Sequence, residues 1–336
     1  MTVSIIIAVK AYCENLKECV SNCLELDYKS EDYEIIILPD SDYPQEKDFF
    51  SNIRGALIRI IPTGNVTPPK KRDIGAKSAK GDILAFLDDD TYPDKEWLKQ
   101  ASKIFKEDDN IGCVCGPAVT ALSDSIRQKA SGLVYSSFLV SANHAFRYLP
   151  QKRREVFDFP SCNFLIRKEL FNQINGFDKP FWPGEDTFLC YKILATGKRM
   201  VYSPEVLVYH HRRPLFAKHL RQIKNYAFHR GYFVKKYPKN SLCLGYFIPS
   251  LFVAWNLGGV IISSYYANFS VFYFFTLAFY FLAISLNSLI LALKEKEPLM
   301  IRIKSLFFVI IGIFLTHITY GIYFIRGLLA NKMPEE

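Results

Sequence analysis

Two long stretches of this chain lack charged side chains. Residues 240–293 contain no Asp, Glu, Lys or Arg, which leaves room for two membrane-spanning helices of about 20 residues each and a tight turn. The other uncharged stretch, residues 305–325, is again about one bilayer long and leaves room for a third span. Too little polar sequence flanks these segments to bury them as a hairpin in a large soluble core. We therefore expect transmembrane helices at about 244–267, 269–293 and 304–326.

Several common motifs are also absent. No Gly-x-Gly-x-x-Gly follows the first apolar run and no Gly-x-x-x-x-Gly-Lys-Ser/Thr occurs, which disfavours a dinucleotide or P-loop nucleotide site. The eight cysteines form neither Cys-x-x-Cys pairs nor a dense disulfide scaffold, so we expect them to be reduced. The first nine residues have no basic region, long apolar segment or cleavage site. We expect no signal peptide and a cytosolic polar domain.

The net charge of +9 is concentrated in one region. Residues 198–239 contain eleven Lys or Arg and one acid, Glu205, a net of +10. Apolar and aromatic residues alternate with these charges, so we predict a basic amphipathic helix at an anionic bilayer surface over residues 213–240. Nucleic acid attracts the same residues, but the adjacent span favours the membrane, and we expect no nucleic acid partner.

The same charges predict an orientation in the membrane. Basic residues between the second and third predicted spans place that loop on the side of the soluble domain. Three spans would then leave residues 334–336 across the membrane. We expect a multi-pass protein of the cell membrane with a cytosolic catalytic domain over residues 1–212, followed by spans within residues 241–330.

The first half of the chain alternates strand-like and helix-like segments. This alternation predicts an α/β fold with a mostly parallel, three-layer sheet. After residue 116 the rhythm is less regular, and this part is expected to supply the acceptor side. Strands are expected at residues 3–9, 33–38, 56–61, 83–87, 112–116, 157–167 and 199–209, and helices at residues 14–26, 67–80, 97–105 and 123–145.

Three consecutive carboxylates, Asp88, Asp89 and Asp90, follow the strand predicted at residues 83–87. Residues 91–94 are typical of a turn that opens a helix. Like charges clustered at the carboxyl edge of a sheet repel one another unless a cation lies between them. Mg2+ or Mn2+ binds one or two protein carboxylates and completes its coordination with phosphate oxygens. The triplet therefore predicts a metal-bound diphosphate; the alternative is a solvated acidic loop that caps the helix at residues 97–105.

Five segments occur in an order that resembles the family 2 glycosyltransferases. The resemblance covers about residues 2–235. The segments are Ile5-Ile-Ile-Ala-Val-Lys10 with Glu14, Ile35-Ile-Ile-Leu-Pro-Asp40, Lys71-Arg72-Asp73 with the Asp-x-Asp motif Asp88–Asp90, Gly184-Glu185-Asp186, and Val208-Tyr-His210.

Members of that family have a GT-A fold, bind a nucleotide-diphospho-sugar such as a UDP- or GDP-sugar through Mn2+ or Mg2+, and invert the anomeric carbon. By this resemblance Asp40 would accept a hydrogen bond from the base, and the backbone around Ala8 with Glu14 would line the nucleoside. Asp88 would face the ribose and the metal, and Asp90 would bind the metal directly. Read alone, Asp40 is an ordinary turn residue after a strand.

The resemblance also places Lys10 and Asp89 among the donor-binding residues. Lys71 and Arg72 would by default be solvated helix charges. At a helix start beside the acidic loop they could instead meet the diphosphate.

The remaining motifs would supply the acceptor side and a third metal ligand. Asp186 matches the family's catalytic base and Glu185 would position the acceptor, whereas the alternative is simply an acidic helix N-terminus. His210 matches a metal-binding histidine, and an imidazole ligand suits Mn2+ better than Mg2+. His211 is its rival, because successive strand residues point in opposite directions.

The leading hypothesis is an inverting glycosyltransferase that moves a single sugar to a lipid-linked, polyprenyl-type acceptor in the membrane. Polyprenyl phosphate itself is the next candidate acceptor. Processive polysaccharide synthesis is a third possibility, but the Gln-x-x-Arg-Trp helix of processive synthases is absent. A membrane scaffold that binds sugar nucleotides without catalysis is the alternative from another class.

Overall fold

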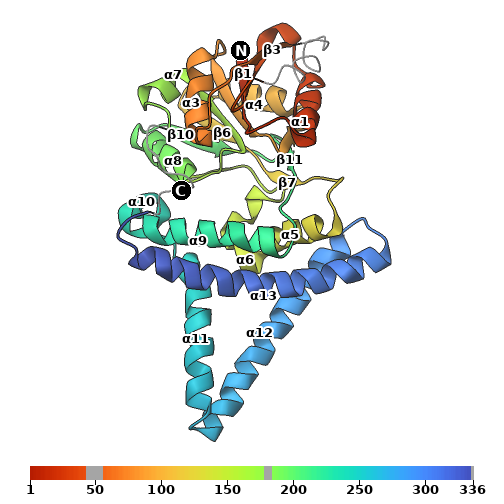
Figure 1. Ribbon diagram of the computed structural model, residues 1–336, viewed down its shortest axis with the longest axis vertical. Coiled ribbons are helices and arrows are strands. Elements are labelled where there is room, and N and C mark those ends of the chain that lie inside the picture. The colour runs from red at the N-terminus through yellow and green to blue at the C-terminus, as the bar shows by residue number, and fades with distance from the viewer. Residues whose placement is uncertain (43–55, 178–183, 334–336) are drawn as a thin grey trace. The chain divides into compact units, whose positions relative to one another are not determined.

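The computed structural model describes residues 1–42, 56–177 and 184–333 of the 336-residue chain (Figure 1). Its contacts divide the chain into two compact units. The first contains Met1–Val119 and Leu149–His211, and the second contains Thr120–Tyr148 and Arg212–Glu336. Residues 120–148, which the sequence analysis assigns to a catalytic domain ending at residue 212, are thus grouped with the C-terminal helices.

The first unit is built on a sheet whose strand order is β3-β2-β1-β4-β9-β6-β10-β8. The four parallel strands are β1 (Val3–Ala8), β2 (Tyr33–Leu38), β3 (Leu57–Ile60) and β4 (Ile83–Asp88). In the register, Ala8 lies beside both Leu38 and Asp88. The order reverses between β1 and β4, and ligands bind at such switch points outside the carboxyl ends of the strands.

The second half of this sheet is mixed. Strand β9 (Asn163–Arg167) runs antiparallel to β4 and to β6 (Ile111–Cys115), and β10 (Arg199–Tyr202) is parallel to β6 and antiparallel to β8 (Arg154–Glu155). The predicted α/β fold with a mostly parallel sheet is confirmed.

Helices cover both faces of the sheet. Helices α1 (Glu14–Leu24) and α4 (Trp97–Phe105) join the hydrophobic core cluster that includes Ile5 and Ile7 of β1. On the other face α3 (Pro68–Ser78) comes so close to the sheet that a Cβ at Gly75 would lie 2.7 Å from Ile6. Shorter helices are η1 (Ser30–Asp32) and α7 (Lys168–Gln173), and α8 (Glu185–Ala195) follows the residues that the structure does not describe.

A second, three-stranded sheet has the order β5-β11-β7. Its strands are β5 (Thr91–Pro93), β11 (Val208–His210) and β7 (Ala118–Thr120). The prediction of a turn over residues 91–94 is wrong for β5, because residues 91–93 pair with a segment more than a hundred positions later. The predicted strand over residues 199–209 is in fact two strands, β10 and β11, in different sheets.

The second unit is helical. Its elements are α5 (Ile126–Ser136), α6 (Phe138–Ser141), η2 (Ala142–Arg147), α9 (Ala217–Lys236), α10 (Pro238–Ser241), η3 (Leu244–Phe247), α11 (Ile248–Ser263), α12 (Ala267–Lys294) and α13 (Leu299–Leu329). The predicted helix over residues 123–145 breaks at Ser137, which is extended and accepts a hydrogen bond from the Leu139 amide.

Within the described part of this unit, three segments are long and apolar enough to cross a membrane: Leu244–Ser263, Ala267–Lys294 and Leu299–Leu329. They correspond to the three predicted spans. The turn between the first two ends just before Ala267, one residue before the boundary expected between spans 244–267 and 269–293. All eight cysteines are free, as expected.

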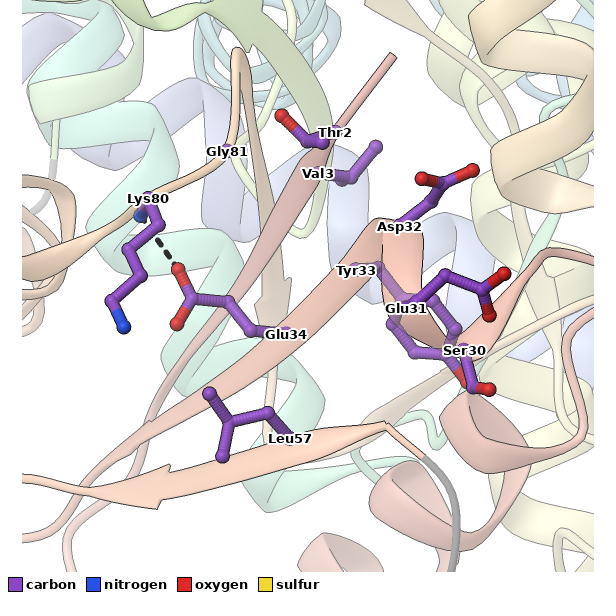
Figure 2. A pocket seen from close by; sticks show the side chains of 10 residues that line it. All are labelled: Thr2, Val3, Ser30, Glu31, Asp32, Tyr33, Glu34, Leu57, Lys80 and Gly81. Atoms are coloured by element: carbon purple, nitrogen blue, oxygen red, sulfur yellow. Dashed lines mark hydrogen bonds between the residues drawn. The ribbon is translucent and has the colours of Figure 1, made fainter.

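A pocket of about 420 Å³ opens at the amino-terminal edge of strands β1 to β3 (Figure 2). The carboxylate of Glu34 accepts hydrogen bonds from the Lys80 amide at 2.6 Å, from Ser4 at 2.8 Å and from Arg59 at 3.1 Å. Burial opposes its charge, but these bonds lower the pKa of Glu34 below its ordinary value. Because this carboxylate is committed to structural hydrogen bonds, the pocket is not the candidate catalytic site.

Candidate active site at the carboxyl edge of the sheet

Strands β1, β2 and β4 end at one edge and deliver polar residues there. Strand β4 ends at Asp88, and Asp89 and Asp90 follow it. Beyond β2 the Asp40 amide donates to the Lys10 carbonyl at 3.1 Å, which joins the chain segments that leave β1 and β2. The predicted donor-binding segments therefore share one edge.

Lys71 holds the chain segments at this edge together by hydrogen bonds. Its ammonium donates to the carbonyl oxygens of Val9 at 2.6 Å and Leu38 at 3.1 Å, and to the carboxylate of Asp40. The side chain is 4% exposed. An ammonium has three donors, and all three are satisfied within the protein. Lys71 therefore orients Asp40 and the two strand ends, and it is not the solvated helix charge of the alternative interpretation.

Arg72, the next residue of α3, joins the acidic loop to the start of α8. Its guanidinium donates to Asp88 Oδ1 at 2.5 Å and to Glu185 Oε1 at 3.5 Å, and it lies 5.7 Å from the centre of the Phe177 ring. Burial opposes its charge, but Asp88, Asp186 and Glu185 raise the pKa of Arg72 above its usual range. The group stays cationic and holds together carboxylates from two distant segments.

The two acids at the start of α8 lie in a poorly solvated environment. Gly184 precedes them with φ at +114°, a conformation that favours glycine. Burial and then the charge of Asp186 raise the pKa of Glu185 to about 8, while Arg72 opposes the shift. Burial also raises the pKa of Asp186, against Arg72 and a hydrogen bond from Ser161. Among the residues described, nothing bonds to the buried Asp186 Oδ1.

We expect Arg72→Met to destabilise the protein by about 3–5 kcal/mol, because it leaves several buried carboxylates without their cation. The pKa of Glu185 is about 8 in the folded protein, above its ordinary value of 4.5. Ionised Glu185 therefore lowers the free energy of unfolding, and this loss grows as pH rises from 4.5 to about 8. Loss of Arg72 raises this pKa further. Thermal unfolding in detergent should show a larger deficit at pH 8 than at pH 5.

Arg72→Lys is the matched control, because it keeps the charge and loses the fork of donors. It should recover part of the melting temperature. An Arg72→Met variant as stable as the wild type at pH 8 would contradict the assigned role.

The acidic loop faces His210, the last residue of β11, and His211 follows directly after this strand. His210 Nε2 lies 3.2 Å from Asp90 Oδ1, whereas His211 Nε2 lies 2.7 Å from Glu18 Oε2 on α1. The two rings thus point to different partners, as the alternation along a strand requires. Burial, then Asp90 and Asp88, raise the pKa of Asp89 to about 7. Burial is the larger cause of this shift, and repulsion from the two neighbouring carboxylates adds to it.

The described residues contain no group of three or more His, Cys, Asp or Glu side chains close enough to form a complete metal site. Asp90 and His210 nevertheless offer an oxygen and a nitrogen ligand side by side, next to mutually repelling Asp88 and Asp89. Mn2+ and Mg2+ typically use few protein ligands and take the rest from substrate phosphates. The residues present therefore fit a divalent cation that is completed by a diphosphate.

The side chains of two predicted donor-binding residues take no part in these contacts. Glu14 begins α1 with an exposed side chain, and the side chain of Lys10 is also exposed. Ala8 lies within β1 beside Asp88. Among the described residues, Glu18, Ser161 and Phe177 contact the site and were not predicted, and Cys13 and Cys19 also contact the acidic loop. Only Glu18 had a signal in the sequence, one helical turn after Glu14.

Comparisons with known proteins identify relatives of the chain and of its fold. Residues 4–174 match the model of the family described as Glycosyl transferase family 2. A Methanococcus voltae protein is 23% identical, with 98% of both chains covered; it is named dolichyl N-acetyl-alpha-D-glucosaminyl phosphate 3-beta-D-2,3-diacetamido-2,3-dideoxy-beta-D-glucuronosyltransferase. The pre-mycofactocin glycosyltransferase of Mycobacterium tuberculosis is 25% identical over 217 residues, which are 63% of this chain and 43% of that protein.

A solved structure shares the fold. The mannosyltransferase PcManGT from Pyrobaculum calidifontis, in complex with GDP-Man and Mn2+, superposes with a TM-score of 0.54 at 16% identity, covering 72% of this chain and 65% of that one. The first unit thus has the GT-A-like fold predicted from the sequence. With the family model matching half of its length, the chain belongs to glycosyl transferase family 2.

Proposed function

We propose that the protein is a membrane-associated, inverting glycosyltransferase that moves one sugar from a nucleotide-diphospho-sugar to a lipid-linked acceptor. The observation that carries this proposal is the bridge formed by Arg72. It brings Asp88 of the acidic loop and Glu185 at the start of α8 to one guanidinium, with Asp186 close enough to affect its pKa. The residues to which we assign donor binding and those to which we assign proton transfer are therefore neighbours of one guanidinium.

In this proposal Asp186 is the base. A carboxylate whose pKa is raised by burial is better matched to proton transfer near neutral pH than an exposed one. It takes the proton of the acceptor hydroxyl as that oxygen bonds to the anomeric carbon and the bond from this carbon to the diphosphate breaks. One displacement of this kind inverts the configuration. Glu185, held by Arg72, positions the acceptor.

Asp90 and His210 would hold Mn2+ or Mg2+ together with Asp88. The cation would neutralise the charge that develops on the departing diphosphate. Asp40, oriented by Lys71, would accept a hydrogen bond from the base of the nucleotide. Because Lys71 already uses its donors on protein oxygens, its contribution would be to place Asp40 rather than to bind phosphate.

Two observations support a lipid-linked acceptor. Three apolar helices associate the chain with a membrane, and the basic helix α9 precedes them. The Methanococcus voltae relative matches the whole chain, and its name describes a transfer onto a dolichyl-linked sugar phosphate. We further propose that the protein lies in the cell membrane and that its catalytic unit faces the cytosol, because nucleotide sugars are made in the cytosol.

The test is transfer by the purified full-length protein in lipid nanodiscs with a panel of UDP- and GDP-sugars and Mn2+. Release of nucleoside diphosphate and incorporation of label into extracted lipid are measured together. We expect both to require a polyprenyl diphosphate carrying a sugar. Label on plain polyprenyl phosphate would favour that acceptor instead, long products would favour a processive synthase, and donor binding without turnover would favour the scaffold.

A further inference from the structure

Helices α9 and α13 lie side by side over most of the length of α9 (Figure 1). His219 hydrogen bonds to Thr316 at 3.0 Å near one end, and Lys235 Nζ donates to the Ala330 carbonyl at 2.7 Å near the other. Contact thus advances in the same direction along both helices, over about 24 Å for sixteen residues of α9. The two helices are parallel neighbours.

Glycines let these two helices approach closely. A Cβ at Gly231 would overlap the carbonyl oxygen of Phe324, and one at Gly327 would overlap that of Phe228. Each helix therefore presents a glycine to the other's backbone. Such an approach fixes α13 along α9, so the C-terminal half of α13 must share the orientation of α9 in any membrane.

Helix α9 cannot cross a bilayer. Exposed basic side chains occur along its whole length, at Lys218, Arg221, Lys224, Lys235 and Lys236. Each charged residue near a bilayer centre opposes insertion, even on the scales that give the smallest penalties. A helix with this pattern lies at the membrane surface, and the half of α13 that packs along it lies there too.

The N-terminal half of α13 is covered by a second polar element. Lys129 of α5 forms an ion pair at 2.5 Å with Glu297, which immediately precedes α13. Arg127 lies 5.8 Å from the centre of the Phe308 ring, and a Cβ at Gly312 would lie 2.8 Å from Val134. Helix α5, which is charged in its first turn, and the basic helix α9 thus cover one side of α13.

The opposite side of α13 is an exposed apolar stripe. The residues of this stripe are separated by three, four or eleven positions, and each of these spacings returns to the same face of an α-helix. The middle of that face is occupied by the hairpin of α11 and α12, through ring contacts of Phe314 with Phe252 and Phe281. The exposed apolar members are Met300, Ile303, Phe307, Ile311, Ile322, Ile325 and Leu329, and one exposed basic residue, Lys304, lies on the same face near its start.

We propose that α13 lies in the plane of the membrane surface, with this stripe against the lipid, and that only the α11–α12 hairpin enters the bilayer. The stripe is continuous with that hairpin, which identifies lipid as its occupant. Basic residues also flank both ends of α13, at Lys294 and Lys296 before it and Arg326 and Lys332 at its end. A spanning helix would place one of these groups on the non-cytosolic side, against the charge rule for membrane proteins.

The consequence is a changed topology. With two crossings instead of three, the chain returns to the side of the catalytic unit, and residue 332 lies on the same side as residue 1. This replaces the expectation from length and hydropathy alone that residues 334–336 lie across the membrane. The inference does not depend on the identity of the donor or of the acceptor.

Protease-cleavable tags at the two ends of the full-length chain test the sidedness in sealed vesicles of one orientation. Both tags should be cleaved from the same side. A control chain with one added apolar span after residue 336 should move the second tag to the other side. Cleavage of the two tags from opposite sides in the unmodified chain would overturn the proposal.

Depth measurements test the plane of α13 independently. Met300→Cys and Ile311→Cys are spin-labelled in a Cys243→Ser background, and their depths are read with polar and apolar quenchers. Eleven residues span about 16 Å along a helix, so a crossing α13 would place the second label about that much deeper. An in-plane α13 gives depths within about 5 Å of each other. Labels shielded from lipid, as in contact with a second copy, would also refute it.

Discussion

Replacing Asp186 by Asn should lower the transfer rate by about 10²–10⁴-fold, the usual contribution of a general base. Asn has nearly the same volume and retains an oxygen that can accept the Ser161 hydrogen bond. It also removes a negative charge from a buried group, so folding should not suffer. Single-turnover transfer and equilibrium binding of the donor with Mn2+ separate the two effects, and donor affinity should stay within about twofold.

Asp109→Asn is the matched control for this variant. Asp109 is fully exposed and lies just before β6, at the amino-terminal end of that strand. The Asp109→Asn variant should transfer sugar at the wild-type rate. An Asp186→Asn enzyme that keeps more than about a tenth of the wild-type rate would remove Asp186 from the role of base.

Asp90→Ala should abolish the metal-dependent part of donor binding. Asp90 is the carboxylate that lies beside His210, and its loss leaves the imidazole without an anionic partner for a shared cation. Loss of even an indirect partner of a metal costs about 10- to 100-fold in affinity, so the loss of a direct ligand should cost at least that. Binding of Mn2+ followed by electron paramagnetic resonance, with and without nucleoside diphosphate, measures this without any turnover.

Donor binding measured in EDTA and then with Mn2+ separates the contribution of the metal from the other effects of the substitution. Wild type and Asp90→Ala should bind the donor equally weakly in EDTA, and Mn2+ should tighten only the wild type. Asp109→Ala controls for the loss of one acidic side chain elsewhere on the unit. An Asp90→Ala protein that still responds to Mn2+ would assign the ligand role to other residues.

Local patterns predicted the elements that position the donor side. The strand expected at residues 33–38 is β2, the one at 83–87 is β4 with Asp88 added, and the helix at 67–80 is α3. These strands are buried on both faces and therefore read as continuous apolar runs. Strong local signals of this kind are sufficient when the sheet partners are parallel neighbours joined by helices.

Elements that depend on distant partners were missed. Strand β5 exists because Tyr92 pairs with Tyr209 and their rings stack with centroids 5.0 Å apart. The break at Ser137 depends on a side-chain cap, and Ser137 also donates to Asn287 of α12 at 2.6 Å. No pattern within a short window of sequence encodes the pairing of Tyr92 with Tyr209 or the bond from Ser137 to Asn287.

The burial of charged side chains was a second feature that could not be predicted from the sequence. A Lys-Arg pair at the start of a helix looks like solvated surface, but both side chains of Lys71 and Arg72 are buried. Their partners come from β1, β2, β4 and α8, so the role of the pair as a bridge could emerge only from the fold. Likewise the two histidines were equivalent in sequence, and the direction of each ring was needed to place His210 beside Asp90.

A structure of the Asp186→Asn protein with its nucleotide-diphospho-sugar and Mn2+ would test the central claim most directly. We expect the cation between the diphosphate and Asp90 with His210, and the anomeric carbon of the sugar facing residue 186 across the Arg72 bridge. A donor bound at another edge of the sheet, or residue 186 turned away from the sugar, would contradict the account.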